Sequence, residues 1–146
     1  MNWKDEAIGK LQKFEAIRQS LSSIPQEIAQ LEAESVSFSR GISVLPSGSR
    51  NVRGQEQRVL NNLVLRQELQ WSLDRARNWI ETVSKALETL TPQQRQVLYV
   101  FFIHPDPNGL DGICQDLQLE KSSVYRHRDK ALERFALAMY GAVESI

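Results

Sequence analysis

Apolar side chains recur along much of the chain in steps of three and four residues, which places them on one face of an α-helix. In residues 1–38 this series consists of Phe14, Ile17, Leu21, Ile24, Ile28, Leu31 and Phe38, with one polar interruption at Ser35. The pattern predicts a helical N-terminal segment with a coiled-coil-like seam. Because Pro25 interrupts the seam just after two serines, we expect two helices or one kinked helix, with the break at residues 22–25.

The apolar series stops in residues 39–54, where serine, glycine, proline and asparagine dominate, and this composition predicts a flexible linker. A second series begins within residues 55–89, and it consists of Leu69, Leu73, Ala76, Ile80, Val83, Leu87 and Leu90. We expect one central helix, roughly 50 Å long at about 1.5 Å per residue. Such a helix must pack on the N-terminal helices, on a second copy of itself, or on both. Trp71 and Trp79 lie off its seam and are expected in a core or a subunit interface.

A strong helix start opens the C-terminal part, residues 90–141. Thr91 can act as the N-cap, Pro92 suits the first helical position, and Gln94 completes a capping box. Large apolar residues follow and predict a helix that provides a core for the rest of the module: Val97, Leu98, Val100, Phe101 and Phe102. The proline-rich segment 104–109 ends this helix.

Two closely joined helices complete the module. The first has Leu110, Ile113, Cys114 and Leu117 on one face. The second begins at about Ser122 and has Val124, His127, Ala131, Leu132 and Phe135 on or near its inward face. We expect His127 to be partly buried or in contact with a phosphate. Because the connection, residues 118–121, is short, the two helices must cross steeply, as they do in DNA-binding helix-turn-helix units. The chain as a whole is therefore predicted to be all-α.

The outer face of this last helix has the chemistry that DNA contacts need. Small polar residues at its start allow close approach, and backbone N–H groups there favour phosphate. Residues 121–134 carry five basic and two acidic side chains, a net charge of +3. The candidate DNA-binding residues are Lys121, Ser122, Ser123, Tyr125, Arg126, Arg128 and Lys130. We expect Arg126 and Tyr125 to reach base edges and the other cations to contact phosphates.

The same residues carry a resemblance to known families. Residues 90–132 resemble region four of bacterial sigma factors, through Leu90-Thr91-Pro92, Gln94-Arg95, Ile113-Cys114, Leu117, Val124 and Lys130-Ala131-Leu132. Residues 42–140 are more similar still to the ArpU/RinA-like late transcription regulators of phages and prophages. That similarity adds the linker Leu45-Pro46-Ser47-Gly48-Ser49 and the pair Tyr125-Arg126. The resemblance implies a sigma region-four-like helix-turn-helix and a prophage-encoded protein of the bacterial cytoplasm.

Three positions depart from that family pattern. Gln118 replaces the glycine of the turn, so we expect a turn of different shape, because a left-handed backbone is costly for glutamine. Glu120 replaces a serine cap and is a weaker N-cap, so the second helix is expected to start later, at Ser122. The segment 104–109 is longer and richer in proline than the usual connection.

Composition narrows the classes of function. The chain has 146 residues, 18 basic and 18 acidic side chains and a net charge of +0, which argues against binding nucleic acid through overall charge and leaves local charge to do so. The single cysteine fits a reducing compartment. We expect no membrane span, no signal peptide, no metal site, no cofactor and no catalytic residue, because the chain lacks the corresponding patterns.

These observations predict a sequence-specific DNA-binding transcription regulator that is not an enzyme. Its expected partner is double-stranded DNA, and a homo-oligomer, most simply a dimer, is expected because one such module buries little surface. Two alternatives stay open. The chain could be a DNA-packaging subunit like a small terminase subunit, or a protein-interaction module that contacts RNA polymerase.

Overall fold

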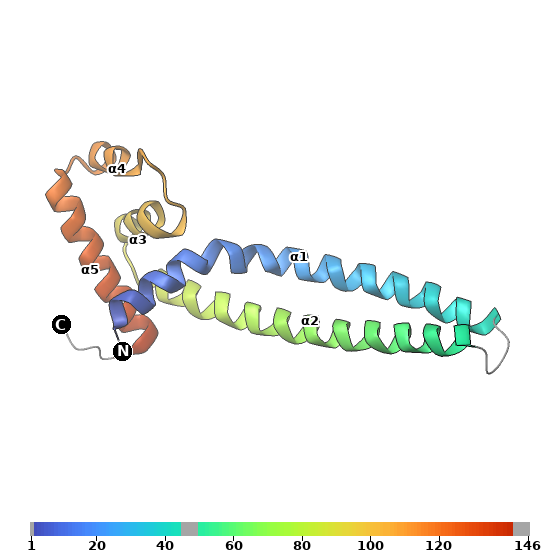
Figure 1. Cartoon of the computed structure of the whole chain (residues 1–146). Helices are drawn as coiled ribbons and strands as arrows, with labels where there is room; N and C mark the ends of the chain where they lie inside the picture. Colours follow the sequence, from blue (N-terminus) through green and yellow to red (C-terminus); the bar gives the residue numbers. More distant parts are fainter. Residues whose placement is uncertain (1, 45–49, 142–146) are drawn as a thin grey trace. The chain divides into compact units, whose positions relative to one another are not determined.

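The computed structural model describes residues 2–44 and 50–141, and these residues form helices and short connections without a strand. The elements are α1 (Trp3–Val44), α2 (Arg50–Glu88), α3 (Pro92–Leu98), a π-helical segment η1 (Tyr99–Ile103), α4 (Gly109–Leu117) and α5 (Lys121–Tyr140) (Figure 1). The prediction of an all-α chain is confirmed. None of the described helices combines the length and the apolarity that crossing a membrane requires.

The chain divides into two compact units, and both long helices contribute to each. The first unit comprises Met1–Arg18 and Asn78–Ile146, and the second comprises Gln19–Arg77. The predicted boundaries at residues 38, 54 and 89 therefore do not coincide with the borders of these units. Helices α1 and α2 each belong partly to the first unit and partly to the second, so the connection between these helices is not a border between the units.

The first unit contains most of the buried apolar side chains. Its larger core joins the first turns of α1, the last turns of α2, α3, η1 and α5, through Ala7, Leu11, Val83, Ala86, Leu90, Leu98, Ile103, Ala131, Leu132, Phe135 and Ala136. Trp79 packs against this core, and its ring lies 6.4 Å from that of Phe14. The seam predicted for the central helix thus contributes Val83 and Leu90 to a buried core.

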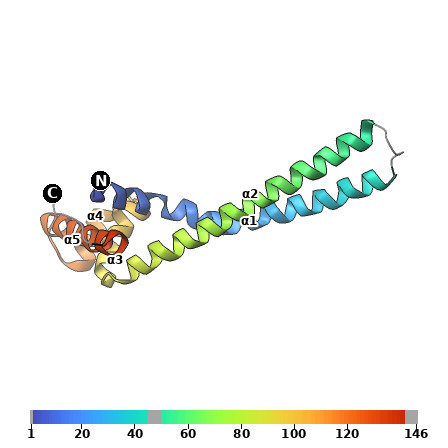
Figure 2. The same ribbon diagram turned by 90° about the horizontal axis from the view of Figure 1, so that it is seen from below.

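The second unit is an antiparallel hairpin in which α1 and α2 run side by side (Figures 1 and 2). Leu31 and Leu73 are its buried apolar residues. Asn62 is also buried, and its side-chain amide donates a 2.8 Å hydrogen bond to the carbonyl of Leu31. Arg66 in turn donates to the Asn62 side-chain oxygen at 2.8 Å. This buried polar link fixes the alignment of the two helices, because any slip would leave the amide without its partner.

The alternative of two separate helices that meet at residues 22–25 is wrong, because α1 is continuous through Pro25. The other alternative, one kinked helix, stays a prediction. The seam on both sides of Pro25 stays partly buried, and this packing outweighs the one backbone hydrogen bond that proline cannot donate.

The predicted linker is also much shorter than expected. Residues 39–44 belong to α1 and residues 50–54 belong to α2, while residues 45–49 lie outside the described part of the chain. A β-carbon added to Gly41 would lie 3.8 Å from the Gln55 side chain, so the two helices approach each other closely here. Glycine lowers helix stability by only about 1 kcal/mol, which tertiary packing readily outweighs.

Candidate nucleic-acid interface

A complete capping box begins α3, the helix that contributes Val97 to the core beneath the candidate interface. The Thr91 hydroxyl accepts a hydrogen bond from the Gln94 backbone N–H at 3.2 Å, and the Gln94 side chain accepts one from the Thr91 N–H at 3.1 Å. Pro92 occupies the first helical position, where its missing N–H costs nothing. This element was predicted from the sequence and is confirmed.

The π-helical segment η1 packs against the start of α4. The His104 N–H donates to the Tyr99 carbonyl, five residues earlier, at 2.8 Å. The wider turn brings Val100 against the start of α4, where a β-carbon on Gly109 would lie 2.0 Å from the Val100 Cγ1 atom. Only glycine leaves room for this contact, so Gly109 sets how closely α4 approaches η1.

A tight turn joins α4 to α5. Gln118 ends α4 with φ 54° and ψ 45°, which is the left-handed conformation. The N–H groups of Gln118 and of Leu119 both donate to the Cys114 carbonyl, and the latter bond measures 3.1 Å. Leu119 then packs against the same apolar cluster as Cys114, which is the contact that commonly accompanies such a helix end. The expectation of a differently shaped turn was therefore wrong, because these contacts hold glutamine in the conformation usual for glycine.

A small core of its own supports the two helices. Val97, Ile113 and Val124 are buried together, one each from α3, α4 and α5, and partly buried neighbours surround them. Helix α5 begins at Lys121 rather than at Ser122, because the Val124 N–H already donates to the Glu120 carbonyl at 3.0 Å. Glu120 is the N-cap, and its side chain makes no capping hydrogen bond.

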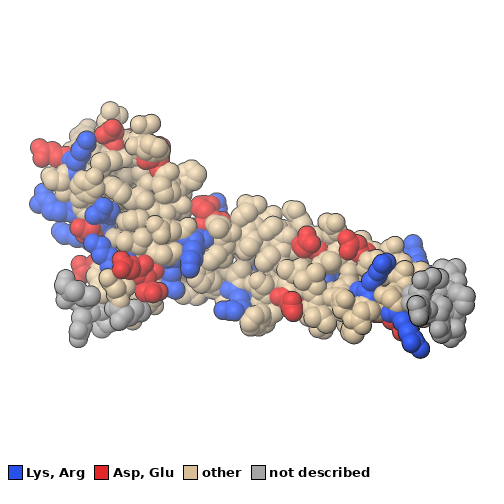
Figure 3. All heavy atoms as spheres, in the orientation of Figure 1, with Lys and Arg blue, Asp and Glu red and all other residues tan. Residues whose placement is uncertain are grey.

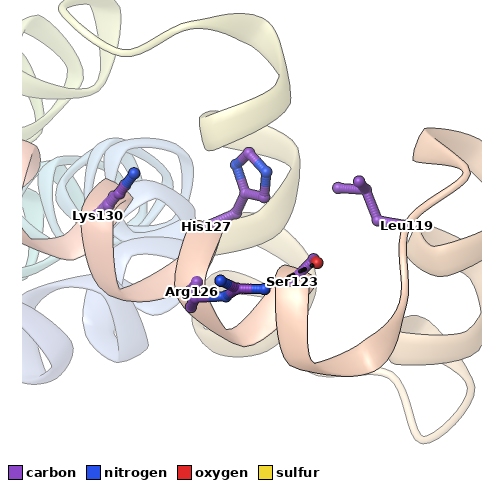
Figure 4. Close-up of a pocket in the computed structure, with 5 residues that line it drawn as sticks. All are labelled: Leu119, Ser123, Arg126, His127 and Lys130. Carbon is purple, nitrogen blue, oxygen red and sulfur yellow. Dashed lines mark hydrogen bonds between the residues drawn. The ribbon is translucent and has the colours of Figure 1, made fainter.

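Four residues of α5 form one row at the spacing of a single helix face; Arg126 and Lys130 are exposed, and Ser123 and His127 are partly buried. Ser123, Arg126, His127 and Lys130 follow each other at i, i+3, i+4 and i+7, and together with Leu119 they line a shallow hollow of about 200 Å³ (Figure 4). Arg126 donates a 3.3 Å hydrogen bond to the Ser123 hydroxyl. We call this set the α5 row. It unites three of the predicted DNA-binding residues.

Two other predicted residues lie elsewhere on α5. The Tyr125 ring packs 5.9 Å from that of Phe101, and the Arg128 guanidinium lies 5.0 Å from the Tyr125 ring and 5.4 Å from the Phe101 ring. Arg128 also pairs with Asp129 at 3.2 Å, and its side chain is only 26% exposed. Arg128 is thus held against η1, whereas Arg126 and Lys130 of the α5 row are exposed.

The remaining two predicted residues lie at the start of α5. Ser122 is exposed. The Lys121 ammonium lies 3.9 Å from the Asp111 carboxylate, and both side chains are largely exposed. This pair is weak, because water screens exposed charges, so Lys121 can exchange its partner for a phosphate at little cost.

Sequence reasoning did not include Leu119 and His127 among the candidate DNA-binding residues, although both line the hollow. It expected His127 to be partly buried or in contact with phosphate, and His127 is partly buried. The spacing of His127 from Ser123 and Lys130 is the signal that connects it to the α5 row. Leu119 has no comparable signal, because its position depends on the left-handed turn that precedes it.

The charges around α5 are mixed. Figure 3 shows lysine and arginine side chains over this helix with acidic side chains between them. Asp129 lies 3.8 Å from Lys4 as well as beside Arg128, so its charge is compensated by two cations. The α5 row contains two cations and no carboxylate, so this face stays locally basic within a chain of zero net charge.

Comparisons with protein-family models, with curated proteins and with solved structures found no match. Among the described residues, no group of three or more histidine, cysteine, aspartate or glutamate side chains is arranged to hold a metal ion.

Proposed function

We propose that this protein is a sequence-specific DNA-binding transcription regulator of phage or prophage origin, and that α4, the Gln118 turn and α5 act as its helix-turn-helix. The observation that carries the proposal is the α5 row, a polar face with the exposed cations Arg126 and Lys130 that begins at the first turn of α5. The major groove of B-DNA, about 12 Å wide, admits one α-helix.

In this proposal the first turns of α5 enter the major groove. Arg126 donates two hydrogen bonds to a guanine, and its existing bond to Ser123 keeps the guanidinium on the groove-facing side. Ser122 and Ser123 are small enough to let the helix approach the bases. Lys121 and Lys130 neutralise phosphates on either side of the groove.

The aromatic contact of Arg128 changes the role proposed for that residue. Its guanidinium lies over two rings and beside Asp129, so a phosphate would have to compete with three existing contacts. We assign Arg128 to positioning the Tyr125 ring, which is 40% exposed and can reach a base edge or a thymine methyl.

A contact with RNA polymerase is the second candidate for this surface. The ion pairs of Asp111 with Lys121 and of Asp129 with Arg128 and Lys4 reduce the positive potential near α5, and mixed charge of this kind suits a protein partner. DNA and polymerase contacts need not exclude each other. A packaging subunit like a small terminase subunit would also bind DNA, but as a ring-like higher assembly.

The test is fluorescence anisotropy of the full chain with duplexes from its own genomic neighbourhood and with random duplex, at two salt concentrations. We expect tight binding to one local sequence. Arg126→Ala should remove about 1–3 kcal/mol of discrimination between that sequence and random duplex. Lys130→Ala should weaken binding to all duplexes alike and reduce the salt slope by about 1.

Lys85→Ala is the matched control, because it removes one exposed cation that is paired with Glu81 on α2. It should leave binding unchanged. If Arg126→Ala and Lys130→Ala also left binding to the local sequence unchanged, α5 would not be the recognition helix. Equal, weak binding to every duplex would favour the polymerase contact instead.

A further inference from the structure

The hairpin unit leaves an apolar stripe of α2 uncovered. Its members are Leu60, Leu63, Val64 and Trp71, which are 52%, 41%, 45% and 64% exposed. The side of α2 that faces α1 is occupied by residues such as Asn62, Arg66 and Leu73. At about 100° per residue, Leu60 and Val64 lie about 200° around the helix from Asn62 and Arg66. The stripe therefore points away from α1.

Stripes of this kind on soluble proteins mark contact surfaces. Leu60, Val64, Gln67 and Trp71 follow steps of four and three, which are the core spacing of a two-stranded coiled coil. We propose that this stripe is the surface through which two copies of the chain associate, with their α2 helices antiparallel. The inference concerns self-association and does not depend on whether α5 binds DNA.

The charges beside the stripe favour the antiparallel direction. With a two-fold axis between Leu65 and Arg66, Leu60 lies against Trp71 of the second copy and Val64 against Gln67 of the second copy. In the same alignment Glu56 flanks the interface opposite Arg77 of the second copy, and symmetry repeats this pair. Both side chains are exposed. The alignment thus places opposite charges together at both ends of the stripe.

A parallel alignment has no such complementarity. It would place Asp74 against Asp74 and Arg53 against Arg53 at core positions, because each residue then meets its own counterpart. Like charges at core positions oppose association. In the antiparallel alignment Asp74 instead lies against Gln57 of the second copy, whose amide can donate to the carboxylate.

Sedimentation velocity of the full chain tests the surface. The wild-type chain should form dimers at micromolar concentration, and Val64→Glu should raise the dissociation constant at least tenfold. Leu65→Glu is the matched control: Leu65 is 42% exposed on the same helix but lies one residue off the stripe, so its variant should dimerise like the wild type. Circular dichroism should show unchanged helix content in both variants. A wild-type chain that stays monomeric at tens of micromolar, or a Val64→Glu chain that dimerises normally, overturns the proposal.

Charge reversal and cross-linking test the direction. Glu56→Arg or Arg77→Glu alone should weaken association, and the double variant should restore it. In a Cys114→Ser background, Gln57→Cys chains mixed with Asp74→Cys chains should cross-link through a short thiol reagent, whereas neither chain alone should do so. Cross-linking of each variant with itself would show a parallel pair and refute the antiparallel alignment. Loss of dimers in Val64→Glu with retained Arg126-dependent DNA binding would separate this inference from the proposed function.

Discussion

Gln118 shows how one residue can hold a strained conformation at the centre of the candidate interface. Among the described residues it is the only one other than glycine with a positive φ. The left-handed conformation costs an L-residue with a β-carbon about 1–2 kcal/mol. We therefore expect Gln118→Gly to raise the free energy of unfolding by about 1 kcal/mol in urea titrations, because glycine adopts this conformation without a steric penalty.

The control for this prediction is Gln115→Gly, an exposed position one turn earlier in α4. Glycine there should lower stability by about 1 kcal/mol, as in any helix interior. Equal effects of the two substitutions would mean that the turn does not strain Gln118.

We expect the stability of the protein to fall at alkaline pH because of Tyr140. No described residue accepts a hydrogen bond from its hydroxyl, which is shielded from solvent. Burial, and secondarily the charge of Glu6, raise the pKa of Tyr140 above 10.0. The unfolded chain therefore ionises first, so the stability contributed by the neutral phenol is complete below pH 10 and is lost as the pH rises toward the folded pKa.

Tyr140→Phe should remove part of that alkaline loss. At pH 7 it should be neutral or stabilising by up to about 1 kcal/mol, since it removes a buried hydroxyl without a partner. Thermal unfolding of both proteins from pH 7 to 11 measures the effect. Parallel stability curves for the two proteins would contradict it.

The spacing of residues along α5 predicts some features of the candidate interface and not others. Spacing on one helix was sufficient to place Ser123, Arg126 and Lys130 outside its inward face, and all three line the same hollow in the structure. Arg128 differs because its position depends on Phe101, which lies in a different element. A contact between segments so far apart in sequence leaves no trace in the spacing of either one.

At the scale of elements, the junction of η1 and α4 predicts an effect of Gly109. A β-carbon there would overlap Val100, so Gly109→Ala must displace either η1 or α4. We expect the free energy of unfolding to fall by about 3 kcal/mol or more, because overpacking typically costs about 1–3 kcal/mol and here one of the two elements must move. Urea unfolding followed by circular dichroism measures this loss.

Gly112→Ala provides the matched control within the same helix. Nothing lies within 4 Å of a β-carbon added at Gly112, so alanine should be neutral or stabilising there by up to about 1 kcal/mol. Val100→Ala should partly rescue Gly109→Ala by removing the methyl group that clashes. A Gly109→Ala protein as stable as the wild type would show that η1 yields easily.

Element starts and ends were predictable where a local hydrogen bond decides them. The capping box at Thr91 is an example, because both partners lie within four residues. The extension of α1 and α2 into the supposed linker was not predictable in this way. Those turns have poor local helix formers, and the structure shows a contact between the two helices there, where Gly41 lies close to Gln55. Such a contact between helices has no signal in local composition. The π-helical turns of η1 likewise have no local sequence signature.

At the scale of the whole molecule, the two units differ sharply in buried apolar side chains. The first unit holds a large core and the small core beneath α4 and α5, whereas the second has Leu31 and Leu73 as its buried apolar residues. Local stability follows burial, so the hairpin unit should open without unfolding the first unit. We expect backbone amides of residues 19–44 and 50–77 to exchange hydrogen at least tenfold faster than those of α5.

Hydrogen exchange followed by mass spectrometry measures this difference, and the protein concentration provides its control. At nanomolar concentration, where association is absent, the difference should be largest. At high concentration the proposed dimer would protect the hairpin by mass action, and Val64→Glu should abolish that protection while Leu65→Glu retains it. Equal exchange in both units at every concentration would mean that the hairpin is as stable as the core of the first unit, and that the exposed stripe on α2 needs no partner.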